Sequence, residues 1–125
     1  MSDKSVSEKL QVKAERTLAV VNANPALDRV IGATGRRTRP EAADVVVLSV
    51  ASLAELQAEL PGVLLTLRAS AMFWIAYPKR TSPMAGDLSR DVIHACAPSF
   101  GLDAVSQIAI DEDWSAMRFK HKREQ

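Results

Sequence analysis

The sequence predicts a three-layer α/β domain whose mostly parallel sheet ends in an antiparallel hairpin. Two apolar runs, 44–50 and 71–77, are short and do not alternate with polar residues. This pattern is typical of parallel strands that carry helices on both faces. Leucines recur every three or four residues over 52–67, which predicts a crossover helix between the two strands. A right-handed crossover then places the strands side by side and parallel.

Composition predicts one domain spanning residues 1–125, with flexible ends at 1–4 and 121–125. The chain is 47% hydrophobic and 25% charged, and its net charge of +1 gives no reason to expect a nucleic-acid partner. Cys96 is the single cysteine, so neither an internal disulfide nor a zinc site is expected. No apolar run approaches the roughly 18 residues of a membrane span, and no signal peptide begins the chain. We therefore expect a cytoplasmic protein with no membrane partner.

The N-terminal third predicts a helix, a strand and a basic loop. A hydroxyl and a carboxylate three residues apart, Ser5 and Glu8, form a capping box and predict a short leading helix. The β-branched run 17–23 predicts the first buried strand. The arginine-rich segment 35–40 is interpreted as a solvated loop, with phosphate binding as the alternative.

Two helices are expected in the middle of the chain. Ser52 and Glu55 form a second capping box, which predicts the start of the crossover helix. Pro61 and the following glycine are expected to divide this helix into two pieces. Asp87 is expected to be the N-cap of a further helix over 87–96.

The last third predicts an antiparallel hairpin that closes one side of the sheet. Its two strands are expected over 104–110 and 115–120, and apolar and charged residues alternate in the second one. The acidic residues 111–113 are interpreted as a solvated turn. Trp114 is expected either to fold back onto the core or to contact a partner.

Several segments carry a resemblance to known proteins. The order of elements resembles a shortened Rossmann-like methyltransferase fold. Residues 18–23, 74–79, 87–92 and 111–115 resemble a family of small bacterial proteins of unknown function. This resemblance implies the fold and no established activity, cofactor or catalytic residue.

The loop after the first strand predicts that no cofactor binds. Dinucleotide and S-adenosylmethionine sites usually continue from this strand into a glycine-rich loop, where only glycine lets the backbone approach the cofactor. Residues 22–27 contain no glycine, and Pro25 removes a backbone donor. No acidic residue ends a second strand to hold a ribose. Both S-adenosylmethionine and NAD are therefore disfavoured.

Candidate ligand-binding residues follow the strands, because parallel strands direct their carboxyl ends to one edge of the sheet. These candidates are Asn22, Asn24, Ser49, Tyr77, Lys79 and Asp87. Lys79 could bind an anion or act as a base, or it could be an ordinary solvated cation. The sequence contains no recognisable catalytic motif and no metal-binding motif.

Three functions remain open. The first is a non-catalytic binding or interaction module whose strand-end rim takes a small anionic ligand or a protein partner. The second is a small enzyme of unknown substrate that uses Lys79 with Asp87 or Asp111 as an acid–base pair. The third is a structural module that forms a homodimer through the hairpin edge and Trp114.

Overall fold

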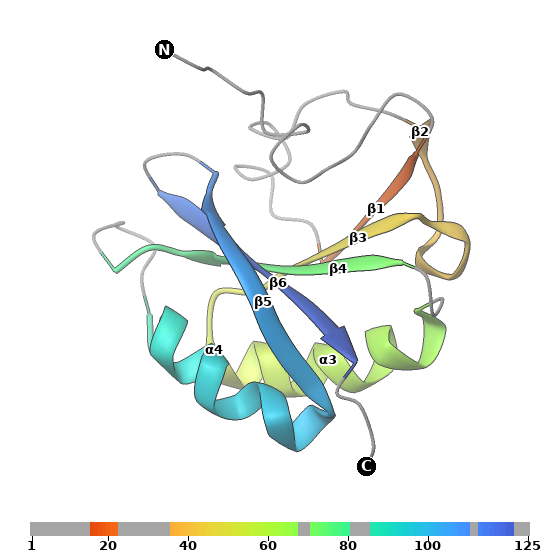
Figure 1. Cartoon of the computed structure of the whole chain (residues 1–125). Helices are drawn as coiled ribbons and strands as arrows, with labels where there is room; N and C mark the ends of the chain where they lie inside the picture. Colours follow the sequence, from red (N-terminus) through yellow and green to blue (C-terminus); the bar gives the residue numbers. More distant parts are fainter. Residues whose placement is uncertain (1–15, 23–35, 68–70, 81–85, 111–112, 122–125) are drawn as a thin grey trace.

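The computed structural model describes residues 16–22, 36–67, 71–80, 86–110 and 113–121. These residues form a six-stranded sheet with the order β2-β1-β3-β4-β6-β5, and two α-helices pack on it (Figure 1). The predicted α/β class, with a mostly parallel sheet and a terminal antiparallel hairpin, is confirmed.

The parallel part of the sheet is built from the apolar runs of the sequence. Its strands are β1 (Thr17–Val21), β3 (Val45–Ser49) and β4 (Met72–Pro78), and β3 lies between the other two. All five residues of β3 are buried, which explains why its sequence does not alternate. Part of the basic segment forms a two-residue strand, β2 (Arg36–Arg37), which pairs in parallel with β1 at the outer edge.

The crossover helix α3 (Leu53–Thr66) is continuous, so the prediction of two helical pieces is wrong. It begins as expected, because the Ser52 side chain accepts a hydrogen bond from the Glu55 N–H at 3.1 Å. Pro61 lies inside the helix but is exposed, so its ring faces away from the sheet. Leu56, Leu60 and Val63 are buried on the opposite side of the helix. This buried face holds the two turns together despite the hydrogen bond that proline cannot donate.

The second helix, α4 (Arg90–Cys96), begins later than the sequence suggested. Its N-cap is Ser89, whose hydroxyl accepts from the Val92 N–H at 3.3 Å, so the assignment of this cap to Asp87 is wrong. A 3-10 turn, η2 (Ala97–Phe100), follows α4 and ends at Gly101. Gly101 has a φ of 76°, a left-handed conformation that glycine adopts without steric cost.

The predicted hairpin is formed by β5 (Leu102–Ala109) and β6 (Trp114–His121). Strand β6 pairs antiparallel with both β4 and β5, so β5 is the outer strand on this side of the sheet. The register shifts between Ala104 and Ser106, which marks a bulge near the start of β5. His121, which was expected to be flexible, belongs to β6.

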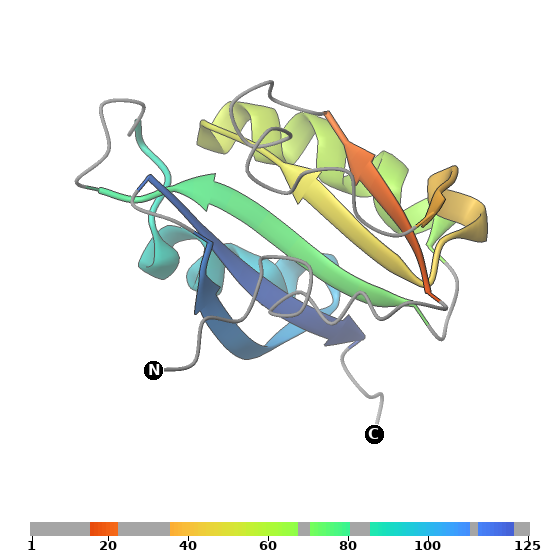
Figure 2. The ribbon, with the colours of Figure 1, turned by 90° about the horizontal axis from the view of Figure 1, so that it is seen from above.

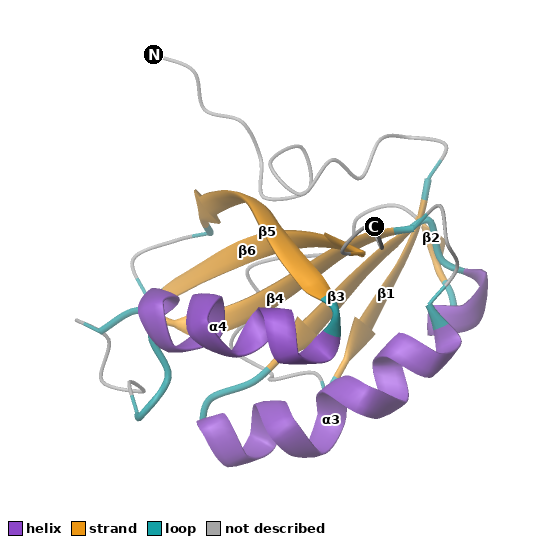
Figure 3. Ribbon diagram, turned by 60° about the horizontal axis from the view of Figure 1, so that its bottom comes forward, coloured by secondary structure: helices purple, strands orange, loops and turns teal. Residues whose placement is uncertain are grey.

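Helices α3 and α4 both cover the same face of the sheet (Figure 3), so the helix layer predicted for the other face is not among the described residues. The larger cluster of buried residues lies between them and the strands, and includes Phe73 from β4 and Phe119 from β6. The opposite face is also buried, and its largest side chains are Trp74 and Trp114. Viewed from above, the strands of the sheet are twisted relative to one another (Figure 2). The predicted leading helix near Ser5 lies outside the described residues.

Within the described ranges, no helix is long and apolar enough to cross a membrane.

Candidate functional site

The carboxyl ends of β1, β3 and β4 form one edge of the sheet, which we call the strand-end rim. The three strands are parallel and in register, with Val21 beside Leu48 and Ser49 beside Ala76. The structure therefore brings Asn22, Ser49 and Lys79 to this edge, as the sequence predicted. Asn24 lies outside the described residues.

Asn22 is fixed at the end of β1 by its backbone and by its side chain. Its φ of 58° is left-handed, and it is the only non-glycine residue of the described chain with a positive φ. Asparagine tolerates this conformation better than most residues. Its Nδ2 donates to the Ser49 carbonyl at 2.8 Å and to Glu55 Oε2 at 2.8 Å. Both amide hydrogens are therefore used to connect β1 with β3 and α3.

Glu55 is a rim residue that the sequence analysis did not select as a ligand candidate. It lies in the first turn of α3, where its carboxylate accepts from Asn22 Nδ2 and from the Ala51 N–H. The capping box with Ser52 placed Glu55 at this helix start but could not show its contact with β1. A carboxylate has about four acceptor positions, so these two bonds leave room for further donors.

Asp87 adds a second carboxylate near the start of α3. Its Oδ1 accepts from the Leu53 N–H, the first residue of the helix, at 2.8 Å. The neighbouring Gly86 lies so close to this region that an added Cβ would stand 3.0 Å from the Ala51 carbonyl oxygen. Asp87 is exposed and satisfies one of the backbone donors that every helix start leaves open.

Lys79 follows β4 on the other side of the rim. Its backbone N–H donates to the Asp113 carbonyl at 2.8 Å, which joins the end of β4 to the turn before β6. The side chain is half-buried. No hydrogen bond or ion pair connects Lys79 with Asp87 in the described chain, and Asp111 lies outside the described residues. The structure thus shows no contact between Lys79 and Asp87, and the pairing of Lys79 with Asp111 stays a prediction.

Tyr77 is the last residue but one of β4, which ends at the rim. Its side chain, however, is buried on the helix-covered face of the sheet. Its phenol oxygen accepts from Gln107 Nε2 on β5 at 3.1 Å. Burial raises the pKa of the Tyr77 phenol, and the nearby Arg90 guanidinium and the hydrogen bonds with Ser115 and Gln107 oppose this shift. Tyr77 therefore faces the hairpin and α4 rather than the open edge.

Trp114 and Ser49 are both buried. Trp114 is 1% exposed and packs with Trp74 and Ala116 on the sheet face opposite the helices, as the fold-back interpretation expected. Its ring is not presented on the surface where a partner would contact it. Ser49 is 2% exposed, and its carbonyl rather than its hydroxyl accepts the hydrogen bond from Asn22.

Among the described residues, no group of three or more histidine, cysteine or acidic side chains could hold a metal ion.

No family model matches the sequence, and no curated protein matches it either. The narrower resemblance to a family of small bacterial proteins therefore stays a prediction.

Several solved structures with a similar fold are methyltransferases. The ribosomal protein L11 methylase from Lactobacillus delbrueckii subsp. bulgaricus superposes with a TM-score of 0.58 at 10% identity, over 94% of this chain and 75% of that one. A SAM-dependent methyltransferase from Thiobacillus denitrificans, in complex with S-adenosyl-L-homocysteine, gives 0.57 at 9% identity, over 97% and 92%. The glycopeptide N-methyltransferase MtfA, complexed with sinefungin, gives 0.55 at 9% identity, over 95% and 94%. The methyltransferase-like fold is thereby confirmed.

These structures contradict the prediction that disfavoured S-adenosylmethionine as a cofactor. Proteins of this fold have been solved with S-adenosyl-L-homocysteine and, in LepI, with S-adenosylmethionine itself. The prediction depended on glycine as the residue that lets the backbone approach the cofactor, and on the backbone donor that Pro25 lacks. Residues 23–27 of this loop lie outside the described residues, and Asn22, its first residue, has the left-handed backbone that glycine adopts readily.

Proposed function

We propose that this protein binds S-adenosylmethionine or S-adenosylhomocysteine at the strand-end rim. The observation that carries the proposal is the pair of carboxylates, Glu55 and Asp87, held at the start of α3 beside the end of β1. The methyltransferase-like fold of the chain supports the proposal.

The chemistry of the rim fits this class of ligand. An adenosyl amino acid offers two ribose hydroxyls and an ammonium group, all of which donate hydrogen bonds to carboxylates. A simple anion would meet the negative charges of Glu55 and Asp87, so it fits this edge less well than a zwitterion does. Lys79, at the end of β4, provides a cation for the ligand's carboxylate.

The rim is also prepared for binding. The hydrogen bonds of Asn22 to Ser49 and Glu55 fix the carboxamide and the carboxylate before any ligand arrives. Groups held in place lose little side-chain entropy on binding. The proposal concerns binding and assigns no residue to methyl transfer.

Calorimetric titration of the full chain with S-adenosylhomocysteine tests the proposal. We expect saturable binding, and we expect Glu55→Gln to weaken it by about tenfold or more, because the hydrogen bonds to the ligand lose their charged acceptor. Asn22→Gly keeps the left-handed backbone and removes only the carboxamide, so it should also weaken binding. Glu41→Gln is the matched control, because Glu41 is an exposed acid in the turn η1 (Pro40–Ala42).

Two results would contradict the proposal. One is the absence of binding heat and of any thermal stabilisation at millimolar ligand, since a ligand at 100 times its Kd adds about 2.7 kcal/mol to the free energy of unfolding. The other is an equal loss of affinity in Glu55→Gln and Glu41→Gln, which would indicate a general effect of charge.

A further inference from the structure

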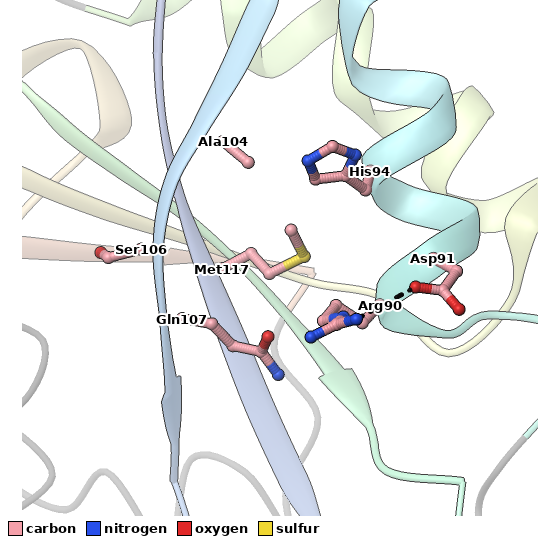
Figure 4. Close-up of a pocket in the computed structure, with 7 residues that line it drawn as sticks. All are labelled: Arg90, Asp91, His94, Ala104, Ser106, Gln107 and Met117. Atoms are coloured by element: carbon pink, nitrogen blue, oxygen red, sulfur yellow. Dashed lines mark hydrogen bonds and ion pairs between the residues drawn. The ribbon is translucent and has the colours of Figure 1, made fainter.

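A separate pocket lies between α4 and the outer strand β5 (Figure 4). Its volume is about 540 Å³, within the range of roughly 300–1,000 Å³ typical of small-molecule sites. It is lined by Arg90, Asp91, His94, Ala104, Ser106, Gln107 and Met117. A smaller hollow of about 360 Å³ adjoins it and shares His94 and Ala104. None of these residues belongs to the strand-end rim, so the pocket is independent of the function proposed above.

One wall of the pocket carries Arg90 and His94. They stand four residues apart on α4, so they lie on the same face of the helix. Figure 4 shows both side chains directed toward β5, Arg90 near Gln107 and His94 near Ala104. An arginine fork and an imidazole one helical turn apart can both donate to the oxygens of one anionic group.

Asp91 does not neutralise Arg90 strongly. Its Oδ1 lies 3.4 Å from Arg90 Nη2, and the two side chains are 83% and 64% exposed. Exposed pairs of this kind contribute little and exchange readily with solvent or other partners. A stronger acceptor that enters the pocket can therefore replace Asp91 as the partner of Arg90.

Met117 and Ala104 form the apolar floor of the pocket. Met117 of β6 extends into it, and Ala104 lies beside His94 (Figure 4). The Gln107 side chain is held in place on β5, because its Nε2 donates to the buried Tyr77 phenol oxygen at 3.1 Å. This bond leaves the carboxamide oxygen and one amide hydrogen of Gln107 to orient a ligand.

We propose that this pocket binds a small molecule that carries one carboxylate or phosphate group on an apolar body. Arg90 and His94 bind the anionic group, Met117 and Ala104 contact the apolar body, and Gln107 orients it. The predicted anionic ligand thus fits this pocket better than it fits the acidic rim.

Nuclear magnetic resonance titration of the full chain tests the proposal with three probes of similar size. These are phenyl phosphate, benzoate and the uncharged benzyl alcohol. We expect saturable amide shifts in α4 and β5 with phenyl phosphate or benzoate, and none with benzyl alcohol. The tighter of the two anions identifies phosphate or carboxylate as the natural group.

Three variants assign the binding to these side chains. Arg90→Gln should weaken binding of the anion about tenfold, because it removes a charge-assisted hydrogen bond. Asp91→Asn should strengthen binding a few-fold, because it removes the competing carboxylate from Arg90. Arg39→Gln is the matched control, since Arg39 is exposed just before η1 and its replacement changes the net charge equally. The amide spectrum of each variant also reports whether the fold is kept.

The proposal is overturned by any of three outcomes. The first is that the amide shifts increase linearly with the concentration of both anions and do not saturate. The second is that benzyl alcohol binds as tightly as phenyl phosphate. The third is that Arg39→Gln weakens binding as much as Arg90→Gln does.

Discussion

The Asp87 carboxylate accepts the backbone N–H of Leu53 at 2.8 Å, and so caps a helix that begins 34 residues earlier in the sequence. This bond attaches the segment before α4 to the start of α3, next to the carboxyl end of β3. It also fixes one of the two carboxylates of the strand-end rim.

Asp87→Ala should lower the free energy of unfolding by about 1 kcal/mol, the usual cost of losing a side-chain cap at a helix start. Urea denaturation measures this change. Asp91→Ala is the control, since its side chain is 83% exposed and forms only a long ion pair. Equal effects of the two substitutions would show that the bond to Leu53 does not stabilise the fold.

Alkaline pH should destabilise the protein through Tyr77. Because burial raises the pKa of this phenol in the folded state, the folded chain retains the proton where the unfolded chain has already lost it. The free energy of unfolding should therefore be unaffected well below pH of about 10 and fall as the pH rises above it, until the folded phenol also ionises. Tyr77→Phe should remove the part of this fall in unfolding free energy that comes from the phenol. The titration of lysines at the same pH affects the variant and the unchanged protein equally.

The same titration can be followed optically. Tyr77 is the single tyrosine of the chain, so the absorbance of tyrosinate reports it alone. A midpoint at or below the value of free tyrosine would contradict the burial of this side chain.

Trp114→Ala should cost about 3–5 kcal/mol of unfolding free energy, because the ring is 1% exposed and fills the core opposite the helices. Leu65→Ala is the control, as Leu65 is 88% exposed and its loss should change stability by less than about 0.5 kcal/mol. If Trp114 were a surface residue awaiting a partner, its replacement would be as mild as that of Leu65.

Replacing Pro61 by alanine should stabilise the protein by roughly 1–3 kcal/mol, because proline is unfavourable inside a helix and this one is exposed. Gly62→Ala should add about 0.5–1 kcal/mol, since the new Cβ would meet no atom within 4 Å beyond its chain neighbours and the nearby backbone of its own helix. Thermal and urea unfolding measure both gains. Loss of stability in Pro61→Ala would mean that α3 does not continue through this residue.

The strand-end candidates show how far the sequence could specify the site. It placed Asn22, Ser49 and Lys79 at one edge because the carboxyl ends of parallel strands always meet there. It missed the role of Glu55, whose capping-box position gave no sign of a contact with Asn22, 33 residues away. It also missed the pocket between α4 and β5, because Arg90 and Gln107 belong to elements whose packing no local pattern specifies.

By itself, the sequence determined the buried strands β3 and β4, the start of α3 and the terminal hairpin. Apolar periodicity and capping are local, so a few neighbouring residues suffice to specify them. Only the tertiary structure decided that α3 continues through Pro61, that Asp87 caps α3 instead of α4, and that Tyr77 faces the hairpin. These features depend on contacts between distant segments, where burial against the sheet outweighs local propensity.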